Sequence, residues 1–158
     1  MKQIDNSSQK IARKKSHPFW RWFWLTFLVV SLVYAWYSFY VPSNDIKWVR
    51  NIISTQELTN NSGKNTLLFF TGKWCVPCRI MKREVFADNE VEKVIHSQVT
   101  PVMIDIDNPN TYELVKFFKF GATPTTIILD SRGKVLDYAL GKIEKKKFLE
   151  MLKHPEAQ

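Results

Sequence analysis

Residues 66–78 read TLLFFTGKWCVPC and join an apolar run to the only two cysteines of the chain, Cys75 and Cys78. The run from Thr66 to Phe70 has the length and composition of a buried strand, and a helical pattern begins near Cys75. The first turn of a helix favours a thiolate, because unpaired N–H groups and the helix dipole stabilise an anion there. The second thiol, one turn later, can attack a mixed disulfide formed at the first. The spacing therefore predicts a redox pair in which Cys75 is the nucleophile and Cys78 the resolving thiol.

Other uses of two cysteines fit the sequence less well. A structural zinc site needs four ligands, and covalent haem attachment needs a histidine directly after the second cysteine, where this chain has Arg79. A purely structural disulfide would close too short a loop to add much stability. A cysteine hydrolase needs a histidine partner, and the three histidines are scattered: His17, His96 and His154. We expect no metal and no cofactor beyond the redox-active disulfide itself.

A second pattern lies upstream, where Trp22 to Val41 gives 20 consecutive residues without Asp, Glu, Lys or Arg. At about 1.5 Å per residue, such a helix is about 30 Å long, which matches the hydrocarbon core of a bilayer. Aromatic residues gather at both ends, as they do at membrane interfaces. They are Trp20, Trp22 and Trp24 on one side and Trp36, Tyr37 and Tyr40 on the other. The pattern predicts a transmembrane helix at residues 22–41.

A cleaved signal peptide is the competing interpretation of this segment, because Val33-Tyr34-Ala35 weakly resembles a small-x-small cleavage pattern. The apolar and aromatic run continues for six residues past Ala35, however, and bulky residues flank the site. These features favour an uncleaved anchor, and either outcome exports the same domain.

Charge predicts the orientation of the anchor. Six Lys or Arg residues and one acid, Asp5, precede Trp22, in a chain whose net charge is +8. By the positive-inside rule, residues 1–21 form a basic cytoplasmic tail. The linker at residues 42–45 and the domain at residues 46–158 are then extracytoplasmic, which in a bacterium means the periplasmic or outer side of the inner membrane. No basic stripe interleaved with exposed aromatics accompanies the high pI, so we expect no nucleic-acid partner.

Residues 46–158 suit one globular α/β domain with a mixed sheet, because strands and helices alternate and a hairpin comes near the end. Phe117, Phe118 and Phe120 are expected in its core. The expected strands are 46–50, 66–70, 100–106, 125–129 and 135–140. The expected helices are a short one from Ser54 or Thr55 to about Gly63, then 75–85, 89–96 after the cap Asp88, 111–118 and 144–153.

The pattern Trp-Cys-x-x-Cys after a strand, with Ala122-Thr123-Pro124-Thr125 before a strand and hairpin, resembles the thioredoxin superfamily over about residues 46–153. Residues 78–88, which read CRIMKREVFAD, are similar to the C-terminal domain of the DsbD family of transmembrane thiol:disulfide interchange proteins. The resemblance implies a thioredoxin fold, a central mixed sheet flanked by helices, preceded here by one transmembrane helix.

The resemblance also implies a substrate-binding surface around the dithiol. Pro124 would be cis and face the cysteines, and Thr123 would present backbone groups to the substrate chain. Trp74, Val76 and Pro77 would complete this surface. Without the resemblance, Thr123-Pro124 would be an ordinary turn before a strand.

Two positions depart from the family. Thioredoxins often carry a buried carboxylate six residues before the first cysteine, and this chain has Phe69 there. Asp105 and Glu84 are the two acids that could take the place of this buried carboxylate. The residue two before Cys75, often acidic in relatives, is Lys73, and a cation there would favour the thiolate. A lysine on an exposed loop is also commonly just solvated.

These observations predict a membrane-anchored thiol–disulfide oxidoreductase. Its expected partners are disulfide-containing exported proteins and a membrane thiol reductant that regenerates the dithiol. A disulfide-forming oxidant and a non-catalytic binding or assembly module are the alternatives. The potentials of Cys-x-x-Cys proteins span roughly −270 to −120 mV, so the motif alone leaves the direction open. Val76-Pro77 lacks the histidine that strong oxidants tend to carry, which favours reduction.

Overall fold

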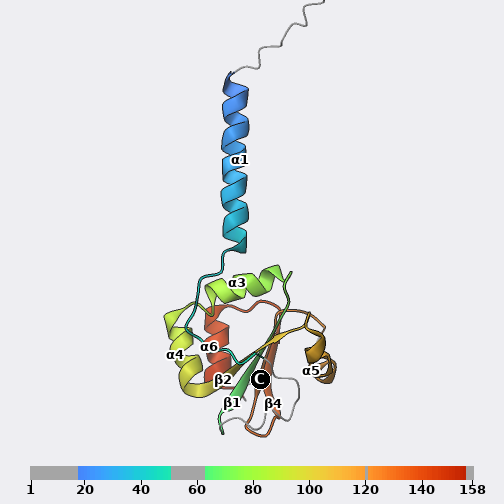
Figure 1. Ribbon diagram of the computed structural model, residues 1–158. Helices are drawn as coiled ribbons and strands as arrows, with labels where there is room; N and C mark the ends of the chain where they lie inside the picture. The colour runs from blue at the N-terminus through green and yellow to red at the C-terminus, as the bar shows by residue number, and fades with distance from the viewer. Residues whose placement is uncertain (1–17, 51–62, 120, 156–158) are drawn as a thin grey trace, which may run out of the picture. The chain divides into compact units, whose positions relative to one another are not determined.

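The computed structural model describes residues 18–50, 63–119 and 121–155. The chain divides into two compact units, Met1–Tyr40 and Val41–Gln158. The described part of the first unit contains the 22-residue helix α1 (Pro18–Phe39), none of whose side chains is buried (Figure 1). By length and composition this helix can cross a membrane, a test that signal sequences also pass. It overlaps most of the predicted span but ends at Phe39, two residues earlier.

The second unit is built on a four-stranded mixed sheet in the order β2-β1-β3-β4. Its strands are β1 (Asn65–Thr71), β2 (Val99–Asp105), β3 (Thr125–Leu129) and β4 (Val135–Leu140). The central strand β1 runs parallel to β2 and antiparallel to β3, and β3 and β4 form an antiparallel hairpin. The predicted mixed sheet is therefore confirmed, with these four strands at or within one residue of their expected positions.

The edge strand expected at residues 46–50 is wrong. Only Val49 pairs with β2, through a single parallel bridge to Val102. Its N–H donates to the Pro101 carbonyl and its carbonyl accepts from Met103 N–H, both at 2.9 Å. The ladder cannot extend toward Lys47, because the next donor on β2 would be Pro101, which has no N–H. The short helix expected from Ser54 or Thr55 lies outside the described residues.

Helices cover both faces of the sheet, so β1 is apolar at successive positions rather than at alternate ones. Leu67 and Phe69 pack with the core that includes residues of three helices, α3 (Val76–Glu84), α4 (Asn89–Gln98) and α6 (Lys145–Lys153). Leu68 and Phe70 point to the opposite face and pack with Leu114. That residue lies in α5 (Tyr112–Phe118), which follows the 3-10 turn η1 (Pro109–Thr111). Figure 1 shows α4 and α6 on one side of the sheet and α5 on the other.

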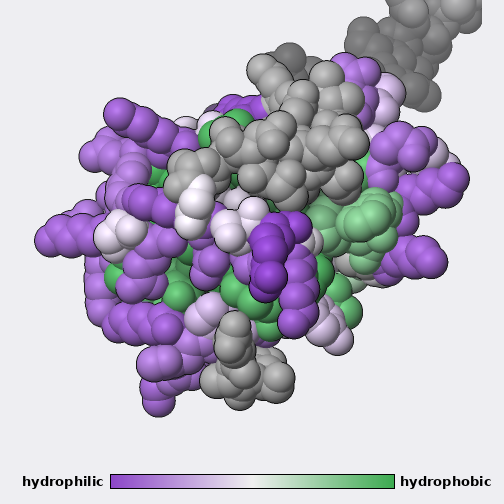
Figure 2. Space-filling model, turned by 90° about the horizontal axis from the view of Figure 1, so that it is seen from below, coloured by the Kyte–Doolittle hydropathy of each residue, from purple (hydrophilic) through white to green (hydrophobic). Residues whose placement is uncertain are grey.

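One face of the domain is shown in Figure 2. On the face shown in Figure 2, hydrophilic side chains cover most of the area, and hydrophobic residues emerge between them. Phe117 is an exception to the expected core, because 63% of its surface is exposed. Leu114 and Phe118, four residues apart, occupy the inward side of the short helix α5, and Phe117 lies beside them. Phe120 lies outside the described residues.

Asp88 caps α4, as its sequence context predicts. Its Oδ1 accepts from the N–H groups of Glu90 at 2.9 Å and Val91 at 3.4 Å. Its Oδ2 lies 2.9 Å from Lys145 Nζ at the start of α6, which is also 3.0 Å from the Glu90 carboxylate. The hydrogen bond from Lys145 holds the pKa of Asp88 below its usual value. The cap therefore also ties the last helix to α4.

Candidate redox site

Three loops meet at one end of the sheet, and the pairing of β1 places them there. Thr71 at the end of β1 is level with Asp105 at the end of the parallel strand β2. Phe70 is level with Thr125 at the start of the antiparallel strand β3. The loop that leads from β1 to Cys75, the loop after Asp105 and the loop before Thr125 therefore share this end.

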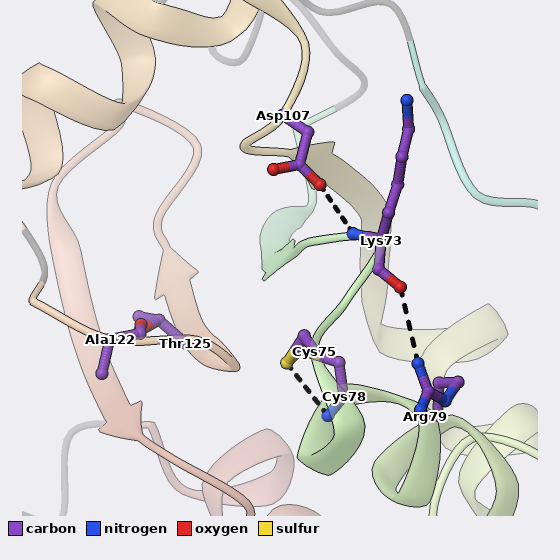
Figure 3. The surroundings of a disulfide bond; sticks show 7 residues. All are labelled: Lys73, Cys75, Cys78, Arg79, Asp107, Ala122 and Thr125. Atoms are coloured by element: carbon purple, nitrogen blue, oxygen red, sulfur yellow. Dashed lines mark hydrogen bonds between the residues drawn. A yellow bond between two sulfur atoms is a disulfide. The ribbon is translucent and has the colours of Figure 1, made fainter. Parts of the chain in front are cut away.

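Cys75 is the N-cap residue of α3. Its backbone is extended, with φ −75° and ψ 96°, and its Sγ accepts from Cys78 N–H at 3.2 Å (Figure 3). The Cys75 N–H donates to the Gly72 carbonyl at 3.2 Å. Pro77 in the first turn needs no hydrogen-bond partner for its nitrogen, so it suits this position. In the reduced protein, the Cys78 N–H and the helix dipole would both stabilise a thiolate at Cys75.

The two cysteines form a disulfide with a Cα–Cα distance of 5.2 Å. They differ in accessibility: Cys75 is half-buried, whereas Cys78 is only 1% exposed and packs in the core with Met81. A substrate sulfur can reach Cys75 from solvent, and Cys78 can be reached only through Cys75 or after opening of the domain. This arrangement suits the attacking and resolving roles that we predict for the pair.

The residues on either side of Cys75 in the sequence are apolar and exposed. Trp74 is 86% exposed, Val76 is 47% exposed, and Pro77 is also exposed. Apolar groups gathered in solvent are typical of binding surfaces. All three were predicted to contact substrate, and their exposure leaves them available to do so.

The loop before β3 carries the other predicted substrate contacts. The Thr123–Pro124 bond is cis, as the resemblance implies, with Pro124 buried and Thr123 half-buried. Thr125 Oγ1 donates to the Ala122 carbonyl at 2.6 Å and closes this turn. Figure 3 includes this loop in the surroundings of the disulfide.

Two side chains that we did not predict as site residues hold the loop before Cys75. Asp107 Oδ2 accepts from the Lys73 N–H at 2.7 Å, and Arg79 Nη1 donates to the Lys73 carbonyl at 3.5 Å. Asp107 follows the end of β2, the strand next to β1, and this position is the signal that could have identified it.

The Lys73 side chain itself extends away from the Cys75 sulfur (Figure 3). Its ammonium group is exposed, so solvent screens its charge. The effect of Lys73 on the Cys75 thiolate stays a prediction.

Phe69 occupies the position of the missing carboxylate and is fully buried. Its ring centroid lies 4.8 Å from that of Phe86 and 6.0 Å from that of Trp48. The conceivable substitute acids have other partners. Glu84 accepts from Lys142 Nζ at 2.7 Å, which lowers the pKa of Glu84, and Asp105 Oδ1 accepts from Asp107 N–H at 3.0 Å.

The described residues contain no group of three or more His, Cys, Asp or Glu side chains that could hold a metal ion.

Comparison with known proteins agrees with the resemblance to the thioredoxin superfamily. The model of the thioredoxin-like domain family matches residues 54–155. The thiol:disulfide interchange protein DsbD of Actinobacillus pleuropneumoniae serotype 5b (strain L20) is 30% identical over 109 residues, which are 66% of this chain and 18% of DsbD. Thioredoxin H3 of Arabidopsis thaliana is 32% identical over 95 residues, 60% of this chain and 75% of that protein. The chain thus spans only about a fifth of the length of its DsbD relatives.

Solved structures share the fold. A DsbH oxidoreductase aligns with a TM-score of 0.58 and 21% identity, over 73% of this chain and 87% of its own. The oxidised C-terminal domain of DsbD from Neisseria meningitidis aligns with a TM-score of 0.52 and 22% identity, over 63% of this chain and 86% of its own. At these identities the likeness establishes the thioredoxin fold.

The hydrogen bond from Lys73 N–H to Asp107 gives a first prediction. In Asp107→Ala, the Lys73 amide should exchange with deuterium about two- to tenfold faster, since a hydrogen bond contributes about 0.5 to 1.5 kcal/mol. Asp107→Asn, which keeps an acceptor oxygen, should show a smaller increase. The measurement is residue-resolved hydrogen exchange of the full chain.

Asp130→Ala provides the matched control. The Asp130 carboxylate accepts from Arg132 and Lys134 N–H groups at 2.8 Å in the hairpin turn, away from the dithiol in sequence and in the sheet. It should leave Lys73 exchange unchanged. Unchanged exchange in Asp107→Ala as well would show that this carboxylate does not hold the loop.

Proposed function

Since this chain belongs to the thioredoxin-like family of disulfide oxidoreductases, we propose that it is a membrane-anchored enzyme that reduces disulfides in exported proteins. One observation carries the proposal: Cys75 caps α3 with an accessible sulfur, and the buried Cys78 lies one turn later. A relative of 30% identity is named a thiol:disulfide interchange protein, which supports the same chemistry.

The reaction needs only the two thiols. The Cys75 thiolate attacks one sulfur of a substrate disulfide, so that a mixed disulfide forms and the second substrate sulfur leaves as a thiolate. Cys78 then loses its proton and attacks Cys75, which releases the first substrate sulfur and forms the Cys75–Cys78 disulfide. Two electrons have passed to the substrate. A membrane thiol reductant returns two electrons and completes the cycle, with no cofactor beyond the disulfide.

The residues around the cysteines support reduction as the direction. Val76 and Pro77 place no ionisable group between the two cysteines. A histidine there would stabilise the reduced thiolate and make the pair more oxidising. The exposed Trp74 and the loop at Thr123 would receive an extended segment of the substrate.

The apolar helix α1 and the basic N-terminus support the proposed location. A helix of 22 residues is about 33 Å long at about 1.5 Å per residue. With residues 1–21 in the cytoplasm, the oxidoreductase domain would face the periplasm, where disulfide-containing clients are found.

Single substitutions of the two cysteines test the chemistry. In the detergent-solubilised full chain, Cys75→Ser should abolish reduction of insulin, because no accessible thiol remains. Cys78→Ser should accumulate a mixed disulfide with insulin, because the resolving thiol is gone. Non-reducing gels and mass spectrometry read both results, and the double variant Cys75→Ser/Cys78→Ser is the control. Equal activity of the two single variants would contradict the assigned roles and favour a binding module.

The anchor has its own test. The full chain should stay with membranes after carbonate washing, and a reporter fused after Gln158 should be extracytoplasmic. Leu28→Arg/Val29→Arg should release the protein from the membrane, since each arginine near the centre of a span costs about 2.5 to 3.5 kcal/mol. Leu28→Ile/Val29→Ile is the apolar control. A soluble mature form that begins near Trp36 would show instead that the segment is a cleaved signal peptide.

A further inference from the structure

A cavity of about 530 Å³ opens beside the loop that leads to Cys75, and three cationic residues line it. They are Arg50, Lys73 and Lys82, and the single acid among the lining residues is Asp105. The cavity is thus polar and carries an excess of positive charge. None of the roles proposed above uses Arg50 or Lys82.

The positive charge of Lys82 is only partly balanced by its surroundings. It is half-buried, and its Nζ lies 5.9 Å from the centroid of the Phe69 ring. Among the ion pairs of the described residues, none includes Lys82 or Arg50. Burial and the nearby Arg50 charge lower the pKa of Lys82, and Asp105 acts in the opposite direction. An anion in the cavity would relieve this repulsion.

Thr71 adds an independent observation. Thr71 is only 4% exposed, and its Oγ1 has no hydrogen-bond partner in the part of the chain that the structure describes. A buried hydroxyl without a partner is costly, and Thr71 belongs to the lining of this same cavity. An oxygen atom bound there could accept its hydrogen bond.

We propose that this cavity binds a phosphate group, with Arg50 and Lys82 as charged donors and the Thr71 hydroxyl as a neutral donor. Arginine and lysine together suit a phosphate, which offers several acceptor oxygens and more than one negative charge. Gly72 and Lys73 line the cavity too, and the Gly72 carbonyl accepts from Cys75 N–H. A bound phosphate would therefore brace the loop that positions the nucleophile.

The phosphate has two possible sources, a phospholipid headgroup and a soluble phosphate. Arg50 and Lys82 also line a second hollow of about 480 Å³ with residues 41–44 and 46–48. These residues come soon after the end of helix α1 at Phe39 in the sequence, which makes a headgroup one source. Binding itself does not depend on the proposed redox function, since it involves neither cysteine.

The test uses the full chain in phosphatidylcholine nanodiscs and measures amide exchange at residues 71–73. In one arm, inorganic phosphate replaces chloride in the buffer at constant ionic strength. The other arm adds no phosphate and replaces part of the lipid with phosphatidylglycerol. We expect saturable protection of residues 71–73 in at least one arm.

Three variants make the result specific. Lys82→Gln should weaken phosphate binding about tenfold or more, because it removes a charged hydrogen-bond donor. Thr71→Val should weaken it without unfolding the domain, because valine keeps the shape and removes the hydroxyl. Lys93→Gln, which removes an exposed charge on α4 outside the cavity, should bind as the wild type does.

The two arms distinguish the sources. Protection by inorganic phosphate identifies a soluble ligand, and protection by phosphatidylglycerol alone identifies a headgroup. No protection in either arm, or equal protection in the wild type and Lys82→Gln, would overturn the proposal.

Discussion

The central strand β1 is hydrogen-bonded on both sides, and the site depends on this constraint. Thr71 is held level with Asp105 on one side, and Phe70 level with Thr125 on the other. The end of the strand cannot shift in register without moving Phe69 and Leu68 out of their separate cores. The loop that follows β1 therefore leaves the sheet at a fixed place, between the loop after β2 and the loop before β3.

From this place the start of α3 supplies the chemistry. Residues at an N-cap usually accept a backbone hydrogen bond through an oxygen, and Cys75 does so through sulfur. The same geometry leaves Cys75 partly exposed and places Cys78 in the core, one helical turn later. The reactivity that we propose thus follows from how the helix begins. The contacts of Asp107 and Arg79 to the Lys73 backbone restrict the segment before it.

Local patterns in the sequence predicted most of the strands and the pairing of Cys75 with Cys78 in a disulfide. Residues 125–129 and 135–140 were placed correctly because apolar runs on both sides of a Gly-containing turn specify a hairpin. The prediction of an edge strand at residues 46–50 was wrong because one proline, Pro101, removes an N–H donor from the neighbouring strand β2. Asp107 was missed because its contact joins residues 34 apart in sequence, and no local pattern contains such a pair. The exposure of Phe117 depends on how a short helix turns on the sheet, which composition does not specify.

The rate of alkylation of each cysteine in the reduced full chain shows whether the start of α3 activates Cys75. Limiting iodoacetamide is added over a range of pH, and mass spectrometry follows each thiol separately. We expect Cys75 to react much faster than Cys78 at every pH. Its rate should rise at a lower pH than that of a free thiol, whose pKa is about 8.5. Cys78 should react at a comparable rate only when denaturant opens the core. Equal rates in the folded protein, or faster modification of Cys78, would contradict the claim that the start of α3 exposes and activates Cys75.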